Sequence, residues 1–248
     1  MSESLLWNVR PSTTGRQIIL FPFLGGFGAS FNRLVRELGG DWDIWTVNPP
    51  GHGPSDMPPQ PRLRALVGAY LTALRPVLRP DALVFGHSMG GVVAYHVLSA
   101  LADDPSLGWR RPTDLVLSAT AAPRDLRVDG FSSMPEANLL AHLRRFGALS
   151  DEVVNDRELV ALFLPAFRAD YCVLAEARRI PPIPLDVRTQ LVLAACDEHT
   201  PPGTALAWQD YIATPILTHV LPGADHMYVL NEVAVLDGIL NGASVARV

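Results

Sequence analysis

The segment Gly86–Gly90, with the sequence Gly-His-Ser-Met-Gly, places a serine between two glycines. It directly follows the apolar run 82–85 and precedes a second apolar run at 92–98. A buried strand that turns at once into a helix is the setting in which G-x-S-x-G forms a nucleophile elbow, because the glycines leave room for the sharp turn. We therefore predict that Ser88 is a nucleophile whose Oγ projects above a sheet. The alternative is a tight strand–helix turn with a solvated serine.

A serine nucleophile needs a base, and the base needs an acid that orients it. Asp197 stands at the carboxyl end of the apolar run 191–196, and His226 lies in a loop just after the run 216–221. Reacting groups in open α/β sheets gather outside the carboxyl ends of the strands, so these residues are expected to converge on Ser88. His226 would take the serine proton, and Asp197 would hold the imidazole in the correct tautomer.

Other residues compete for these two roles. His199 also lies on a loop at a strand end, but it would crowd the place that the acid must occupy. Glu198 is one residue deeper into that loop, and Asp225 would have to fold back on its own turn. Asp114 precedes its strand, which places it at the opposite edge of the sheet.

The composition suits one globular domain over residues 1–248 with a core of its own, since 48% of the residues are hydrophobic and 18% are charged. No segment has the apolar length of a membrane span and the first residues show no secretory signal pattern, so we expect a cytoplasmic protein without a membrane partner. The net charge of −5 argues against a nucleic-acid partner, because phosphate neutralisation needs a basic face.

Several other chemistries are excluded by residue type. All 20 basic residues are arginine, which rules out a lysine Schiff base and a P-loop lysine. Cys172 and Cys196 make no disulfide framework, and we predict both as small buried side chains. No Cys/His cluster has metal-ligand spacing, so no metal is expected.

The order of elements predicts a mostly parallel sheet with helices on both faces. Apolar runs and turn residues indicate strands at 16–21, 42–47, 82–85, 114–119, 191–196 and 216–221, with helices at 31–38, 62–78 and 92–98. Between about 122 and 184 three amphipathic patterns follow one another, at 136–146, 151–163 and 166–179, with Pro165 between the last two. We interpret this segment as a helical lid over the site; the alternative is an elaborate crossover connection.

Motifs along almost the whole chain resemble those of type II thioesterases, the free-standing editing enzymes of polyketide synthases and non-ribosomal peptide synthetases. They are Phe-Pro-Phe-Leu-Gly-Gly at 21–26, Asn-Pro-Pro-Gly-His-Gly at 48–53, the elbow at 86–91, Leu-Pro-Ala-Phe-Arg-Ala-Asp-Tyr at 164–171 and Pro-Gly-Ala-Asp-His at 222–226. The segment 164–171 is similar to a lid segment that most other hydrolases lack. The chain departs from the family pattern at Phe23, often histidine or tyrosine, at Leu24, usually alanine, and after Asp197, where the usual Asp-Asp-Pro is missing.

This resemblance implies an α/β-hydrolase fold and hydrolysis of acyl thioesters from the phosphopantetheine arm of an acyl or peptidyl carrier protein, with no cofactor of the enzyme's own. The oxyanion hole is expected to use the backbone amides of Leu24 and Met89. We expect an apolar acyl pocket within reach of the lid, formed by Phe23, Phe131, Met134, Phe163 and Phe167. Arg168 and Asp170 are expected to pair and anchor the last lid helix.

Local basic charge supports a transient carrier-protein partner, because carrier proteins are usually acidic. The lid and its flanks contain Arg124, Arg127, Arg144, Arg145, Arg178 and Arg179, although these arginines would serve equally to solvate helix faces. Two other functions stay open: a small-molecule carboxylesterase with the same three residues, and a catalytically silent hydrolase fold used as an interaction module. The presence of serine, acid and histidine in the expected order argues against the last.

Overall fold

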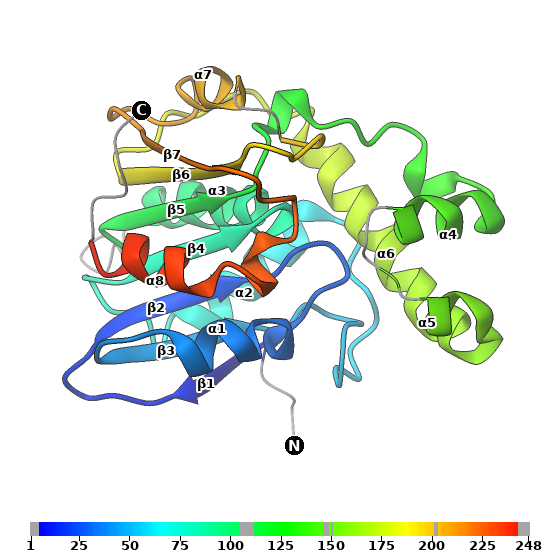
Figure 1. The fold of residues 1–248 in the computed structure, drawn as a ribbon, viewed down its shortest axis with the longest axis horizontal. Helices are drawn as coiled ribbons and strands as arrows, with labels where there is room; N and C mark the ends of the chain where they lie inside the picture. The colour runs from blue at the N-terminus through cyan, green and yellow to red at the C-terminus, as the bar shows by residue number, and fades with distance from the viewer. Residues whose placement is uncertain (1–4, 105–111, 146–148, 150, 201–202, 243–248) are drawn as a thin grey trace.

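The computed structural model describes residues 5–104, 112–145, 149, 151–200 and 203–242. Its strands are β1 (Leu6–Arg10), β2 (Arg16–Phe21), β3 (Trp42–Val47), β4 (Leu83–His87), β5 (Asp114–Ser118), β6 (Arg188–Ala194) and β7 (Leu217–Leu221). They form one seven-stranded sheet in the order β1-β3-β2-β4-β5-β6-β7 (Figure 1). β1 pairs antiparallel with β3, and all other neighbouring strands in this sheet pair parallel.

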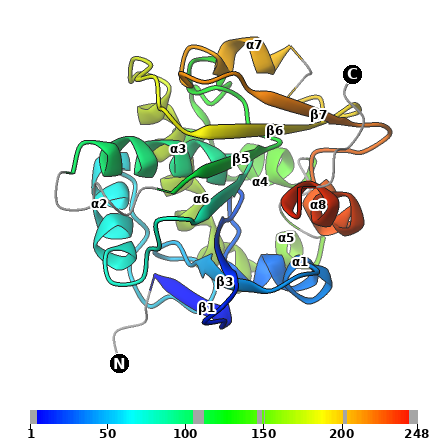
Figure 2. The same ribbon diagram turned by 90° about the vertical axis from the view of Figure 1, so that its left-hand side faces the viewer.

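Helices cover both faces of the sheet. The helices of the described chain are α1 (Asn32–Glu37), α2 (Leu63–Leu74), α3 (Met89–Ala102), α4 (Glu136–Arg145), α5 (Asp151–Asn155), α6 (Arg157–Ala177), α7 (Thr204–Trp208) and α8 (Val233–Leu240). Figure 2 shows α2 and α3 on one side of the sheet and α1 and α8 on the other. This arrangement confirms the predicted α/β-hydrolase class.

The central strands are buried on both faces, which explains why they read as unbroken apolar runs. In β2, Ile19 and Phe21 join the core beneath α2 and α3, whereas Ile18 and Leu20 join the core beneath α1 and α8. Successive side chains of a strand point to opposite faces, so a strand between two helical layers places apolar side chains in a core on each side. The predicted bounds 16–21 and 42–47 are those of β2 and β3.

The segment between β5 and β6 contains α4, α5 and α6, which Figure 1 shows grouped beyond one end of the sheet. The predicted helix boundary at Pro165 is wrong, because α6 runs without interruption from Arg157 to Ala177. It begins where the Asp156 side chain accepts hydrogen bonds from the amides of Glu158 and Leu159. Burial of Leu164, Ala166 and Phe167 around the proline offsets the backbone hydrogen bond that proline cannot donate.

Other differences from the predicted elements lie at the margins of the sheet. The edge strand β1 was not expected, and the helix predicted at 62–78 ends at Leu74. The pattern predicted at 136–146 becomes α4, and its last residue lies outside the described part of the chain. Cys196 is exposed after β6 and Cys172 is half-buried, so the prediction of two buried cysteines is wrong. Within the described residues, the longest apolar helical stretches fall short of what a bilayer span requires.

Candidate active site

Ser88 occupies the sharp turn between β4 and α3 that its motif predicts. Its backbone has φ 52° and ψ −119°, a conformation that costs energy for any residue with a side chain. A Cβ on Gly86 would lie 2.5 Å from the backbone of Gly90 and Gly91, and a Cβ on Gly90 would lie 2.2 Å from the Phe21 carbonyl oxygen. The turn therefore requires glycine on both sides of the serine.

His226 connects Ser88 to Asp197 through hydrogen bonds at both ring nitrogens. Its Nε2 lies 2.9 Å from Ser88 Oγ, and its Nδ1 lies 2.8 Å from Asp197 Oδ2. The Asp197 carboxylate also accepts the amide of His199 at 2.8 Å and the hydroxyl of Thr200. These residues come from the loops after β4, β6 and β7, as expected for the carboxyl edge of a parallel sheet.

The charge state of Asp197 decides the tautomer of His226. Burial opposes ionisation of this carboxyl, but the hydrogen bond and charge of His226 and the bonds from Thr200 and His199 outweigh burial and lower its pKa to about 2. An ionised carboxylate only accepts hydrogen bonds, so Nδ1 carries the ring proton and Nε2 is left to accept the Ser88 hydroxyl proton. The Nε2 lone pair of His226 thus faces the Ser88 hydroxyl.

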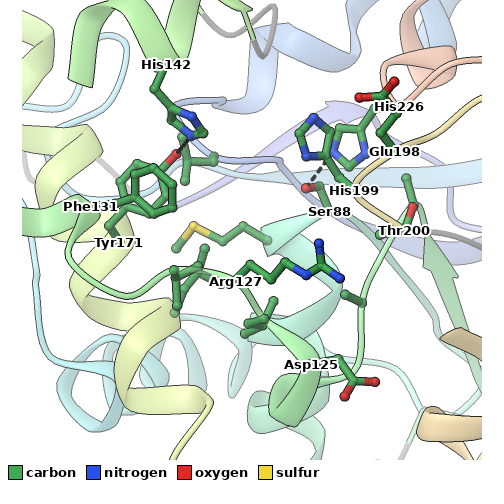
Figure 3. Close-up of a pocket in the computed structure, with 17 residues that line it drawn as sticks. Ser88, Asp125, Arg127, Phe131, His142, Tyr171, Glu198, His199, Thr200 and His226 are labelled. Carbon is green, nitrogen blue, oxygen red and sulfur yellow. Dashed lines mark hydrogen bonds between the residues drawn. The ribbon is translucent and has the colours of Figure 1, made fainter. Parts of the chain in front are cut away.

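A cavity of about 170 Å³ opens beside Ser88. Leu24 and Met89 are among the residues that line it. Phe131, His142 and Tyr171 lie together on the side of the cavity away from Ser88 (Figure 3). The Phe131 ring stacks on His142 with centroids 4.2 Å apart, and His142 Nε2 lies 2.9 Å from the Tyr171 hydroxyl. Arg127 lies between the two groups of side chains (Figure 3).

A family model described as a thioesterase domain matches residues 16–241. The chain belongs to this thioesterase family. It is 32% identical over 183 residues to the AMB antimetabolite synthetase AmbE of Pseudomonas aeruginosa, which covers 73% of this chain but only 8% of AmbE.

Two solved structures share the fold over nearly the full chain. The RedJ thioesterase from the prodiginine pathway of Streptomyces coelicolor has a TM-score of 0.83 and 27% identity, covering 96% of this chain and 94% of its own. The type II thioesterase BorB from the borrelidin biosynthetic cluster has a TM-score of 0.84 and 25% identity, covering 98% of each chain. The resemblance to type II thioesterases that the motifs indicated is confirmed.

The acyl-pocket residues expected from the sequence are only partly assembled in this thioesterase. Phe131 lines the cavity, whereas Phe23, Met134, Phe163 and Phe167 are absent from its lining as far as the described chain shows. Phe23 instead meets the ring of His87 edge-on at 5.9 Å. The expectation selected apolar side chains, and it missed His142 of α4 and Tyr171 of α6. These two polar side chains hydrogen-bond each other across the two helices, a contact that local sequence patterns do not record.

The residues that compete with Asp197 and His226 make other contacts in the described part of this thioesterase. His199 lines the cavity with its ring centroid 5.3 Å from that of His226, and burial together with the charge of His226 lowers its pKa. Asp225 caps its own turn by accepting the Met227 amide at 2.9 Å. Asp114 pairs with Arg16 and Arg188 where the parallel strands begin, at the opposite end of the strands from Ser88.

His87, inside the elbow, contacts the backbone of His226, and sequence reasoning did not single it out. Its Nε2 lies 3.0 Å from the backbone carbonyl of His226 and its Nδ1 lies 2.9 Å from Ser118 Oγ. Burial holds the pKa of His87 well below its ordinary value, so the ring is neutral and its Nε2–H donates to that carbonyl. The sequence offered one signal for this contact, because His87 ends β4 and directly precedes Ser88. Neighbouring side chains of a strand point in opposite directions, so the His87 ring is directed away from the side on which Ser88 Oγ lies.

The described part of the chain brings no three histidine, cysteine, aspartate or glutamate side chains together in a way that could hold a metal ion.

Proposed function

We propose that this thioesterase hydrolyses acyl thioesters carried on the phosphopantetheine arm of a carrier protein, with Ser88 as nucleophile. His226 acts as general base and then general acid, and Asp197 orients it. The observation that carries the proposal is the hydrogen-bonded series from Ser88 Oγ through His226 to Asp197, at the edge of a cavity in a chain of the thioesterase family.

In the first step Ser88 Oγ attacks the thioester carbonyl carbon while His226 Nε2 takes the hydroxyl proton. The oxyanion that forms accepts hydrogen bonds from the amides of Met89 and Leu24. Met89 is the first residue of α3, so its amide has no partner within the helix. The carbon–sulfur bond then breaks and the thiol leaves with the proton from His226. Water, activated by the same histidine, releases the acid and restores the serine.

The related proteins support a carrier-bound substrate, since RedJ and BorB are named for biosynthetic pathways and AmbE is a synthetase. An open groove of about 660 Å³ adjoins the catalytic cavity, and its lining includes the arginines Arg124, Arg127 and Arg178 and the acidic residues Asp125, Asp129 and Glu198. Arg124 pairs with Asp210, and Arg178 pairs with Asp129, so part of this basic charge is already balanced. We propose that the groove admits the pantetheine arm.

Replacement of the nucleophile tests the roles of the three residues. Ser88→Ala is expected to lower kcat by about 10³-fold or more, and adding His226→Ala should cost little further, because the residues act as a unit. A fluorophosphonate should label Ser88 in the unaltered protein. Near-normal hydrolysis by Ser88→Ala would contradict the mechanism.

Comparison of substrates tests the carrier protein. The same acyl group is presented on a carrier protein, on free pantetheine and as a p-nitrophenyl ester, and kcat/KM is measured for each. We expect a clear preference for the carrier. Equal values for carrier and pantetheine would contradict a carrier partner, and a preference for the oxygen ester would favour a small-molecule carboxylesterase.

A further inference from the structure

Asp170 of α6 is a buried carboxylate, 5% exposed, whose hydrogen-bond partners lie outside its own helix. The expected pair with Arg168 is not what the structure contains, since Arg168 donates to the carbonyls of Ser132 and Met134 at 2.7 and 2.8 Å. Asp170 Oδ2 instead accepts the amide N–H of Gly25 at 2.9 Å and lies 3.0 Å from His52 Nε2. Its carboxylate therefore reaches from the segment between β5 and β6 to the loop after β2.

Gly25 belongs to a tight turn formed by Phe23, Leu24, Gly25 and Gly26. The Gly26 amide donates to the Phe23 carbonyl at 2.8 Å, and Gly25 has φ +74°, which together describe a type II turn. A Cβ on Gly25 would lie 2.2 Å from the Phe167 ring. Phe167 and Asp170 are three residues apart and share one face of α6, so this face contacts Gly25 through both an aromatic ring and a carboxylate.

His52 gives the carboxylate a charged partner. Its Nδ1 lies 3.0 Å from the Pro50 carbonyl and its Nε2 faces Asp170, and both of these oxygens accept hydrogen bonds, so both ring nitrogens must donate. Burial alone would lower the pKa of His52, but the charge and hydrogen bond of Asp170 outweigh it and raise the pKa. Hydrogen bonds to an ionised acceptor are shorter and stronger than neutral ones, so the hydrogen bond from the Gly25 amide to Asp170 is a strong one.

We propose that Asp170 is a positioning residue for the oxyanion hole. By holding the Gly25 amide, it fixes the turn so that the preceding amide, that of Leu24, faces the cavity beside Ser88. Leu24 lines that cavity, whereas the amide of Gly25 is already used by Asp170 and is not available to the substrate. The inference deepens the proposed function and rests on it, because the Leu24 amide matters only if an oxyanion forms at Ser88.

A second carboxylate of α6 provides a matched control. Glu176 accepts the amide of Leu63 at 2.8 Å and pairs with Arg62, so it also ties α6 to the backbone of another element. It does not contact the turn at residues 23–26 or line the catalytic cavity. The loss of Glu176 therefore shows how much stability α6 loses when one of its contacts with another element is removed. The turn at residues 23–26 stays intact in that variant.

The experiment compares Asp170→Ala, Asp170→Asn and Glu176→Ala in the full chain with an acyl-pantetheine thioester. Asp170→Ala is expected to lower kcat about 10- to 100-fold with KM little changed, a loss bounded by that of a whole oxyanion donor. Asp170→Asn should recover most of the activity, because its amide oxygen still accepts the Gly25 N–H. Glu176→Ala should keep the kcat of the unaltered protein, even if its melting temperature falls.

The affinity for a boronic acid is a second measurement, and it would stay unchanged if Asp170 had only a structural role. Its tetrahedral adduct with Ser88 places an oxygen where the oxyanion forms, so Asp170→Ala should weaken it by the same factor that it lowers kcat. If the unaltered protein neither cleaves the thioester nor binds boronate, the proposed function itself is wrong. If it does both and Asp170→Ala behaves like Glu176→Ala, only the positioning role is overturned.

Hydrogen exchange in the unaltered protein keeps the inference testable if Asp170→Ala fails to fold. The Gly25 amide should be strongly protected although it lies in a loop. Exchange of this amide at the rate of an open loop would overturn the proposal.

Discussion

At the scale of single residues, the Leu24 amide is the part of the proposed oxyanion hole that a side-chain change can test. Leu24 is the second residue of the type II turn at 23–26, a position that accepts proline because its φ is near that of the proline ring. Leu24→Pro should therefore keep the turn while removing one donor, and lower kcat by about 10²-fold. Leu24→Ala keeps the amide and serves as the control; equal kcat for the two variants would show that this amide is not a donor.

Asp197 links the site to the stability of the fold. Its pKa in the folded protein is about 2, below the ordinary value of 3.8, so the ionised form stabilises the fold above about pH 4 and this contribution disappears as pH falls towards 2. Asp197→Asn removes the contribution. We expect its unfolding free energy to fall below that of the unaltered protein at pH 6, and the gap to narrow steadily towards pH 3.

Denaturant unfolding at several pH values measures this gap, and Glu198→Gln, at the neighbouring position in the loop, is the control. The same Asp197→Asn variant should lose about 10³-fold or more in kcat, because His226 would no longer be held in the required tautomer. A gap in stability that is constant with pH would contradict the assignment of the ionised carboxylate.

At the scale of elements, the segment from about 122 to 184 is proposed as a lid, and its parts differ in burial. The second half of α6 is embedded, with Phe167, Tyr171 and Val173 at most 4% exposed. The first half is more open, with Leu162 65% exposed. Because α6 also contacts Gly25 through Asp170, its second half is expected to behave as part of the core, and any opening is confined to α4, α5 and the start of α6.

Hydrogen exchange resolved by segment tests this division. Amides of α4 and α5 should exchange faster than those of Ala166–Ala177, which should approach the protection of the central strands. Equal protection of all three helices with and without an acyl ligand would contradict a mobile lid.

At the scale of the whole molecule, the proposed carrier partner can be tested through charge, because a protein with a net charge of −5 would attract an acidic carrier only through a local basic region. Arg178 lines the groove beside the site but not the catalytic cavity, and its removal would also leave Asp129 unbalanced. Arg178→Gln should therefore lower kcat/KM for the carrier substrate and leave that for free pantetheine unchanged. The difference should fade with added salt.

Arg188 is the matched control for that measurement, since it pairs with Asp114 at the opposite edge of the sheet. Arg188→Gln should not change kcat/KM for either substrate. If both arginine variants lower kcat/KM for the carrier substrate by the same factor, the interaction would depend on overall charge and not on the groove.

The sequence by itself determined the elements whose signal is local. The strands β2 and β3 were predicted with correct bounds, because apolar residues predominate in each of them and turn residues flank them. The elbow at Ser88 was equally readable, since the strand, the glycines and the helix are adjacent in the chain. The positions of Asp197 and His226 followed from the strands that precede them.

Only the tertiary structure decided the features that join distant parts of the chain. Edge strand β1 has one fully buried residue, Leu6, so its sequence carries little apolar pattern and its pairing depends on β3. The contacts of Asp170 with Gly25 and His52 span 145 and 118 residues. Such hydrogen bonds depend on where α6 lies relative to the loops after β2 and β3. Local residue patterns indicate burial and turns, but they do not show which distant backbone amide a buried carboxylate will bind.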